Sequence, residues 1–108
     1  MITEENFCAM ALSFEGTEQR PHFDRWGFRV QGKRMYASYL AANNTANVFL
    51  RPAEQQLFCA ADPQHIYPVP NKWGEKGATT FVLSDVSPDI LQEALRSAYE
   101  DVIRPKKG

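Results

Sequence analysis

Three segments of the chain space their apolar residues as an α-helix does. In the first, four apolar residues stand three or four positions apart: Phe7, Met10, Ala11 and Phe14. This spacing predicts a helix that begins after a Thr3 cap and ends at Gly16. The second helix should begin at Pro52 and end before Asp62-Pro63. Its expected buried face consists of Ala53, Leu57, Ala60 and Ala61.

The third helical segment lies near the end of the chain and carries the clearest signals. Ser87 offers a cap, Pro88 suits the first helical turn, and Asp89 suits the positive end of the helix dipole. An apolar stripe follows at Leu91, Leu95, Ala98 and Val102. The helix should end at Pro105, and basic residues suit its negative end: Arg104, Lys106 and Lys107.

Between the helices, apolar and polar residues alternate as they do in half-buried β-strands. A hairpin is predicted from Phe28 to Tyr39, with its turn at Gln31 to Lys33. A further strand spans Asn47 to Arg51. The segment His65 to Pro70 is at best an edge strand, because its two prolines cannot donate ladder hydrogen bonds. The run Thr79 to Ser84 is rich in β-branched and aromatic residues and is the clearest strand.

This order of elements predicts an α+β fold, in which helices pack on an antiparallel β-sheet. A length of 108 residues suits one domain that spans residues 1–108. The core is expected to contain the residues whose spacing matches a helix or strand period: Phe7, Met10, Leu12, Phe28, Val30, Val48, Leu50, Leu57, Phe81, Leu83, Leu91, Leu95 and Val102.

Composition and charge narrow the classes of function. Twelve basic and thirteen acidic residues give a net charge of -1, which supplies no long-range attraction for nucleic acid or an anionic membrane. Any contact with nucleic acid must therefore come from local charge. Met1 to Phe14 lacks the basic start of a signal peptide, and no apolar run reaches the roughly 20 residues of a membrane span. We expect a cytoplasmic monomer that makes no contact with a membrane.

The residue types that carry catalysis or bind metals are scattered along the chain. Cys8, Cys59, His22 and His65 stand singly, so we expect no metal and no cofactor. The chain lacks a glycine-framed Ser or Cys nucleophile and a phosphate-binding glycine loop before a helix, so no catalytic residue is identified and no enzyme is predicted. A reducing cytoplasm would keep both cysteines as unpaired thiols.

Positive charge concentrates in the stretch "RPHFDRWGFRV". Three of its residues are candidates for binding an anion: Arg20, His22 and Arg25. The alternative, which we favour for this stretch, is the ordinary solvated face of a β-hairpin. A second candidate is the stretch "NKWGEKG", which is expected to form an exposed hairpin tip. Its Trp73 could stack on a nucleobase, or the flanking glycines could simply permit a turn that folds the ring over the sheet.

Five motifs, taken in their order, resemble the MmcQ/YjbR family: "ALSFEGTEQRPHF", "FRVQGKRMYA", "VFLRPAEQ", "PNKWGEKGATTFVL" and "LQEALRSAYEDV". The resemblance covers nearly the whole chain. Its most specific parts are the end of the first helix at Ala11 to Gly16, the hairpin at Phe28 to Lys33, and the segment from Trp73 to Leu83.

The resemblance implies a compact α+β fold with two loop wings, a shape proposed to bind DNA. The wings would comprise Gln31 to Arg34 on one side and Asn71 to Lys76 on the other. The residues implied for nucleic-acid binding are Arg29, Lys33, Arg34, Lys72, Trp73 and Lys76. We expect weak contacts to phosphates without sequence preference, because no base-reading helix is identifiable.

Two alternatives remain open at this point. The chain could be a small binding module for an anionic metabolite or a protein partner, using the face from Arg20 to Arg34. It could also be an enzyme, for which the resemblance supplies no catalytic residues. Salt dependence separates DNA binding from the binding module, because displacing counterions from several phosphates makes DNA affinity fall steeply with salt.

Overall fold

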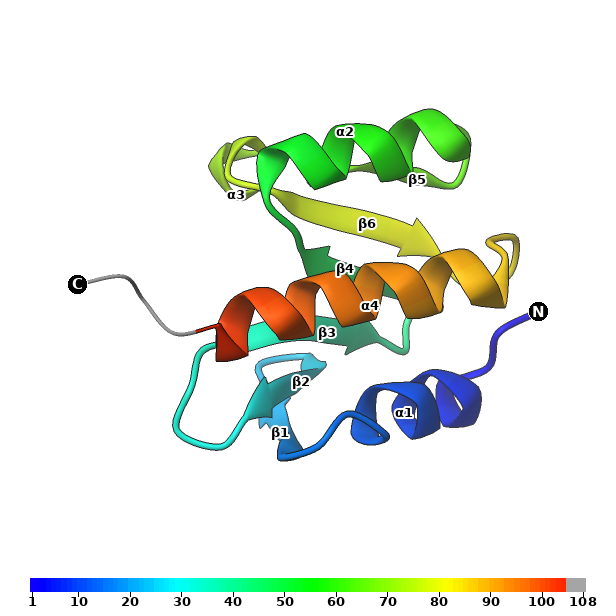
Figure 1. The fold of residues 1–108 in the computed structure, drawn as a ribbon. Helices are drawn as coiled ribbons and strands as arrows, with labels where there is room; N and C mark the ends of the chain where they lie inside the picture. The colour runs from blue at the N-terminus through cyan, green and yellow to red at the C-terminus, as the bar shows by residue number, and fades with distance from the viewer. Residues whose placement is uncertain (105–108) are drawn as a thin grey trace.

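The computed structural model describes residues 1–104, which form six strands and four helices (Figure 1). In chain order these are α1 (Glu4–Leu12), β1 (Thr17–His22), β2 (Arg25–Val30), β3 (Met35–Leu40), β4 (Thr45–Phe49), α2 (Pro52–Ala61), β5 (Ile66–Pro68), α3 (Lys72–Glu75), β6 (Ala78–Val82) and α4 (Pro88–Ile103). The strands form one sheet in the order β1-β2-β3-β4-β6-β5, and every neighbouring pair is antiparallel. The predicted α+β fold with an antiparallel sheet is confirmed.

The helices α1, α2 and α4 pack on one face of the sheet, which we call the covered face (Figure 1). α4 runs across the middle strands and buries the predicted apolar stripe. Aromatic pairs join the other helices to the sheet. Phe7 of α1 meets Phe28 of β2 edge-on with ring centroids 5.4 Å apart, and Phe58 of α2 meets Phe81 of β6 at 6.4 Å. Each buried large apolar side chain contributes about 1.5–3 kcal/mol of transfer free energy.

A β-bulge in the second hairpin changes which residues face the core. Phe28 pairs with Ala37, but the next residue, Arg29, pairs with Met35, so Tyr36 has no partner across the ladder. Strict alternation would have placed Met35 on the same face as Ala37. The extra residue instead turns Met35 to the opposite face and sends both Tyr36 and Ala37 into the core.

The bulged Tyr36 is fully buried and holds α1 against the hairpin. Its hydroxyl donates to the carbonyl oxygen of Ala11 at 3.2 Å and shares a hydrogen bond with the Thr17 hydroxyl at 2.8 Å. Burial raises the pKa of Tyr36 to about 12. The phenol therefore stays protonated wherever the protein is folded below that pH, which keeps both hydrogen bonds intact.

Several sequence predictions are wrong in detail. The first helix ends at Leu12 and not at Gly16, and Leu12 is 43 % exposed because it points away from the sheet. The bounds of α2 are correct, but its predicted buried face is wrong: Leu57 is 72 % exposed, and the three predicted alanines are also exposed. Phe58 and Cys59 pack on the core instead. α2 has apolar residues on both faces, so its spacing alone did not select the face that packs.

The strands also differ from the prediction: β2 begins at Arg25 and not at Phe28, β6 spans Ala78–Val82 and not residues 79–84, and one strand was missed. β1 was not predicted, because its sequence TEQRPH is polar and does not alternate; it forms the outer edge of the sheet beside β2. The strand expected at residues 47–51 begins two residues earlier, at Thr45. β5 is an edge strand as predicted.

The remaining core predictions are largely confirmed. Buried as expected are Phe7, Phe28, Val48, Leu50, Phe81, Leu83, Leu91, Leu95 and Val102, while Met10 and Val30 are half-buried. Cys8 and Cys59 are both free thiols, and burial raises the pKa of each. Pro105, Lys106 and Lys107 lie outside the described residues. Within residues 1–104, no helix is both long and apolar enough to cross a membrane.

Candidate functional site

A cavity of about 790 Å³, which we call the groove, has its floor on the face of the sheet opposite the helices and reaches Asp101 near the end of α4 and Pro52 at the start of α2. Strand alternation supplies its floor, because the residues next to the core residues of each strand point the other way. The floor consists of Arg25, Met35, Ser38, Asn47, Phe49 and Ala78. One side is formed by His22, Phe23, Arg34 and Asp101, and the other by Arg51, Pro52, Val69, Asn71, Trp73 and Lys76.

The two predicted wings lie on opposite sides of this groove. The first wing is the β2–β3 turn, where Gly32 adopts a positive φ of 79° and Arg34 enters β3. The second wing contains Trp73 and Lys76. In Figure 1 the β2–β3 turn, the last turn of α4 and α3 all lie toward the same end of the molecule. The fold therefore brings together two segments that stand about forty positions apart in the sequence.

The second wing is a short helix, α3, and not the hairpin turn that the sequence predicted. Asn71 caps it by accepting a hydrogen bond from the backbone N–H of Trp73 at 2.8 Å. Gly74 lies inside this helix, where an added Cβ would stand 1.8 Å from the carbonyl oxygen of Val69. The glycine is thus required for close backbone approach, which the turn prediction did not anticipate.

A second glycine and a buried glutamine tie this wing to the rest of the fold. Gly77 has a φ of +118°, and a Cβ there would stand 1.7 Å from the carbonyl oxygen of Leu50. Gln55 of α2 is buried and donates from Nε2 to the carbonyl oxygens of Gly74 and Ala78, at 2.9 and 3.1 Å. The second wing is therefore a rigid part of the scaffold, which fixes the position of Trp73.

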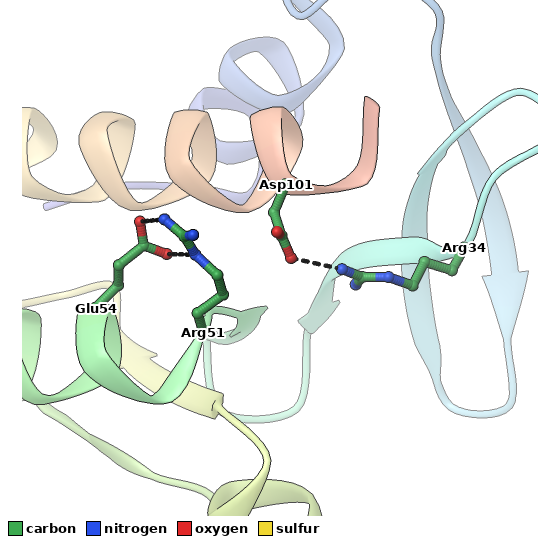
Figure 2. Close-up of polar contacts among 4 residues, drawn as sticks. All are labelled: Arg34, Arg51, Glu54 and Asp101. Carbon is green, nitrogen blue, oxygen red and sulfur yellow. Dashed lines mark hydrogen bonds and ion pairs between the residues drawn. The ribbon is translucent and has the colours of Figure 1, made fainter. Parts of the chain in front are cut away.

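Four cationic side chains line the groove: Arg25, Arg34, Arg51 and Lys76. Two of them hold carboxylates (Figure 2). Arg34 donates from Nη2 to Asp101 at 2.8 Å, and Arg51 makes a two-pronged contact with Glu54 at 3.2 and 2.7 Å. The Arg51 guanidinium lowers the pKa of Glu54. Exposed pairs of this kind contribute about 0–1 kcal/mol, so an incoming anion can compete for either arginine at little cost.

The other two cations have no carboxylate partner. Within residues 1–104, neither Arg25 nor Lys76 forms an ion pair. Arg25 donates from Nε to the Ser38 hydroxyl at 2.9 Å, while its Nη2 is buried and has no hydrogen-bond partner among the described residues. Burial lowers the pKa of the Arg25 guanidinium, an effect that nearby Asp24 partly offsets. A buried and unpaired guanidinium nitrogen is costly, so the floor of the groove favours an acceptor.

Two aromatic rings project from the sides of the groove. Phe23 at the β1–β2 tip is 94 % exposed and has a positive φ of 58°, a conformation that is uncommon for a bulky residue. Trp73 on α3 is 64 % exposed, and the ammonium of Lys76 lies 5.5 Å from its ring centroid. Both rings belong to the lining of the same cavity. The groove thus combines positive charge with exposed flat apolar surfaces.

The structure brings some of the predicted site residues together and separates others. Arg34, Trp73 and Lys76 line the groove, as do the secondary candidates His22 and Arg25. Lys33 and Lys72 are exposed on the wings but are outside the lining.

The remaining two candidates share one carboxylate. Arg29 contacts Glu18 at 2.9 Å and Arg20 contacts it at 3.4 Å, and this hydrogen bonding lowers the pKa of Glu18. Both arginines are therefore engaged along β1 and β2 outside the groove lining.

Sequence reasoning missed three groove residues with distinctive properties. Phe23 carried a usable signal, since a phenylalanine between His22 and Asp24 is unusual in a polar turn. Arg51 and Asp101 carried none, because Arg51 stood at the end of a predicted strand and Asp101 within the last predicted helix, and only the tertiary fold places them at the groove. Among the described residues, no group of three or more metal-binding side chains is present.

Comparison with solved structures gives a class for this fold. The chain is similar to the crystal structure of Deinococcus radiodurans protein DR2400, which carries the domain designated DUF419, with a TM-score of 0.80 and 23 % sequence identity. The match covers 96 % of this chain and 80 % of that one, so the two share a fold. The family model for YjbR matches residues 12–101, and the chain therefore belongs to the YjbR family. Comparison with curated proteins gives no match.

Proposed function

We propose that this protein binds nucleic acid through the groove, weakly and without sequence preference. The observation that carries this proposal is that both predicted wings border one cavity whose lining includes four cationic residues. Positive charge gathered from separate segments supplies the local attraction that the net charge of -1 does not.

The expected contacts are phosphate contacts. Arg25 and Lys76 have no acidic partner among the described residues, and Arg34 and Arg51 are themselves exposed, so a phosphate can compete with the half-buried carboxylates that they hold. Within the described fold α1, α2 and α4 lie on the covered face, and α3 at the side of the groove is only four residues long, so no helix is available to enter a major groove. Recognition of base sequence is therefore not expected, and affinity should be on the order of 1–100 μM, as for non-specific binding.

Salt dependence is the first test of this proposal. Contacts with about three phosphates predict that affinity falls roughly 20- to 40-fold between 50 and 200 mM salt. A labelled oligonucleotide titrated at both salt concentrations, with fluorescence anisotropy as the readout, measures this slope. Binding that does not weaken with salt would contradict a phosphate-based mode.

A matched pair of double variants locates the contact. Arg34→Gln with Lys76→Gln removes one groove cation from each wing and frees Asp101 to repel phosphate. Lys33→Gln with Lys72→Gln removes the same charge from the same wings, but at positions outside the lining. The first variant should lose about tenfold in affinity and the second about twofold. Equal losses, or no binding by the parent protein, would reject the groove as a nucleic-acid site.

A further inference from the structure

We propose that the ligand of the groove is an unpaired nucleotide, with its base stacked on Phe23 or Trp73 and its phosphate held by the groove cations. This inference rests on the proposed function and specifies the partner as single-stranded. It also assigns a stacking role to Phe23 and a hydrogen-bonding role to Arg25. The positive charge of the groove does not by itself account for either role.

The size and lining of the groove favour an unpaired base over a duplex. A volume of about 790 Å³ lies within the range of roughly 300–1,000 Å³ that is typical of sites for small molecules. Its lining includes the apolar side chains of Phe49, Pro52 and Val69. A duplex keeps its bases stacked inside and presents phosphates, so it would contact the rim and leave this apolar surface exposed to water. An unpaired base can enter and cover it.

The two exposed rings are placed as stacking surfaces. Phe23 is almost fully exposed, although burial of a phenyl ring is favourable, and its backbone adopts a strained left-handed conformation. Such strain is maintained where the surrounding structure imposes it, and it is concentrated at functional sites. The ring of His22 packs edge-on against Phe23, with centroids 4.8 Å apart, and so supports one side of it.

Trp73 supplies the second surface from the opposite side of the groove. Its backbone is fixed by the Asn71 cap and by the glycine contacts of the α3 segment. The Lys76 ammonium lies over the indole ring, 5.5 Å from its centroid, and Trp73 is 64 % exposed, so a base can reach the ring. A cation beside a stacking ring is the combination that binds a phosphate next to a base.

Arg25 supplies a polar group at the floor of the groove. Its Nε is engaged by Ser38, and its Nη2 is buried without a partner in the described part of the chain. A small movement of this side chain would bring the free nitrogen to a phosphate oxygen or a base carbonyl. Ligand binding would then satisfy a donor that the folded protein leaves unpaired.

The test compares three probes on the parent protein and on three variants that lack one or both rings. The probes are a labelled oligothymidylate of about ten nucleotides, the corresponding duplex, and thymidine monophosphate as competitor. The variants are Phe23→Ala and Trp73→Ala, singly and combined. Tyr67→Ala is the matched control, because Tyr67 is an exposed aromatic residue on β5 outside the groove lining. Thermal melting of every variant verifies that it is folded.

The expected result is a loss of about tenfold in single-strand affinity for each ring removed, with duplex affinity and the Tyr67 control unchanged within about twofold. If thymidine monophosphate displaces the oligothymidylate from the parent protein but not from the ring variants, that result also supports the inference. It would identify a free nucleotide as the source of the ligand.

Two results would overturn the inference, and they are distinguishable. If duplex and single strand bind equally and the ring variants bind as the parent does, stacking is wrong; a loss in the Arg34 and Lys76 variant would still support phosphate binding. If none of the three probes binds to the parent protein, the proposed function fails together with the inference.

Discussion

The covered face and the groove face are built from the same strands, but they place aromatic and charged residues differently. On the covered face, Phe28 is fully buried and contacts Phe7, and no charged side chain is part of the core cluster among the described residues. On the groove face, Phe23 is exposed, and Arg25 is partly buried with an unpaired nitrogen. On the covered face the aromatic side chains find their contacts within the protein. On the groove face a phenyl ring remains exposed and a guanidinium nitrogen has no partner among the described residues, as in a binding surface.

This difference explains why the fold was more predictable than the site. α4 was predicted correctly because its cap, its proline and its apolar stripe are all local features. The groove depends on β4 pairing with β6, which brings residues near position 50 beside residues near position 75. No local pattern encodes that pairing. Arg51 and Asp101 therefore could not be assigned to a site from sequence.

Two errors within the fold have the same origin. α3 is only four residues long and depends on backbone contacts of Gly74 and Gly77 with distant carbonyl groups, so its local sequence indicated a turn. α2 carries apolar residues on two faces, and packing against Phe81 selected Phe58 over Leu57. In both cases tertiary contacts overrode a local preference.

The largest expected effect comes from comparing two phenylalanines of one hairpin. Phe28→Ala should cost about 3–5 kcal/mol of unfolding free energy, because it leaves a cavity beside Phe7. Phe23→Ala should change stability by less than about 0.5 kcal/mol, because the ring is exposed. Urea unfolding measures both. A large stability loss at Phe23 would make it a structural residue and remove the contrast between the faces.

An intermediate effect is expected at Tyr36 on the covered face. Its pKa is about 12 in the folded protein and 10.0 ordinarily, so the unfolded chain releases the proton first as pH rises. Stability should therefore be fully present below pH 10 and fall as the pH approaches 12. Tyr36→Phe should lower the free energy of unfolding by about 1–2 kcal/mol at neutral pH, since Ala11 and Thr17 lose a hydrogen-bond partner. As the pH rises from about 10 to about 12, the variant should lose less stability than the parent protein. Equal declines in both proteins would contradict the assignment.

Only a small effect on stability is expected at Arg25 on the groove face. Arg25→Met keeps an apolar stem and removes a poorly satisfied charge, while Ser38 loses one donor. These changes oppose each other, so stability should change by less than about 1 kcal/mol. Affinity for oligothymidylate should nevertheless fall about tenfold. Arg96→Met, at an exposed position on α4, is the control and should change neither quantity. A strongly destabilised Arg25→Met would indicate a structural role for the arginine.

The central claim, that the groove face binds and the covered face does not, is tested most directly by the two tryptophans. Trp73 lines the groove, whereas Trp26 alternates onto the same side of β2 as Phe28. Trp26→Phe leaves Trp73 as the sole tryptophan, and Trp73→Phe leaves Trp26. When oligothymidylate is titrated into each variant, the fluorescence of Trp73 should be quenched to saturation, and that of Trp26 should stay constant. Quenching of Trp26 with no change at Trp73 would contradict the account.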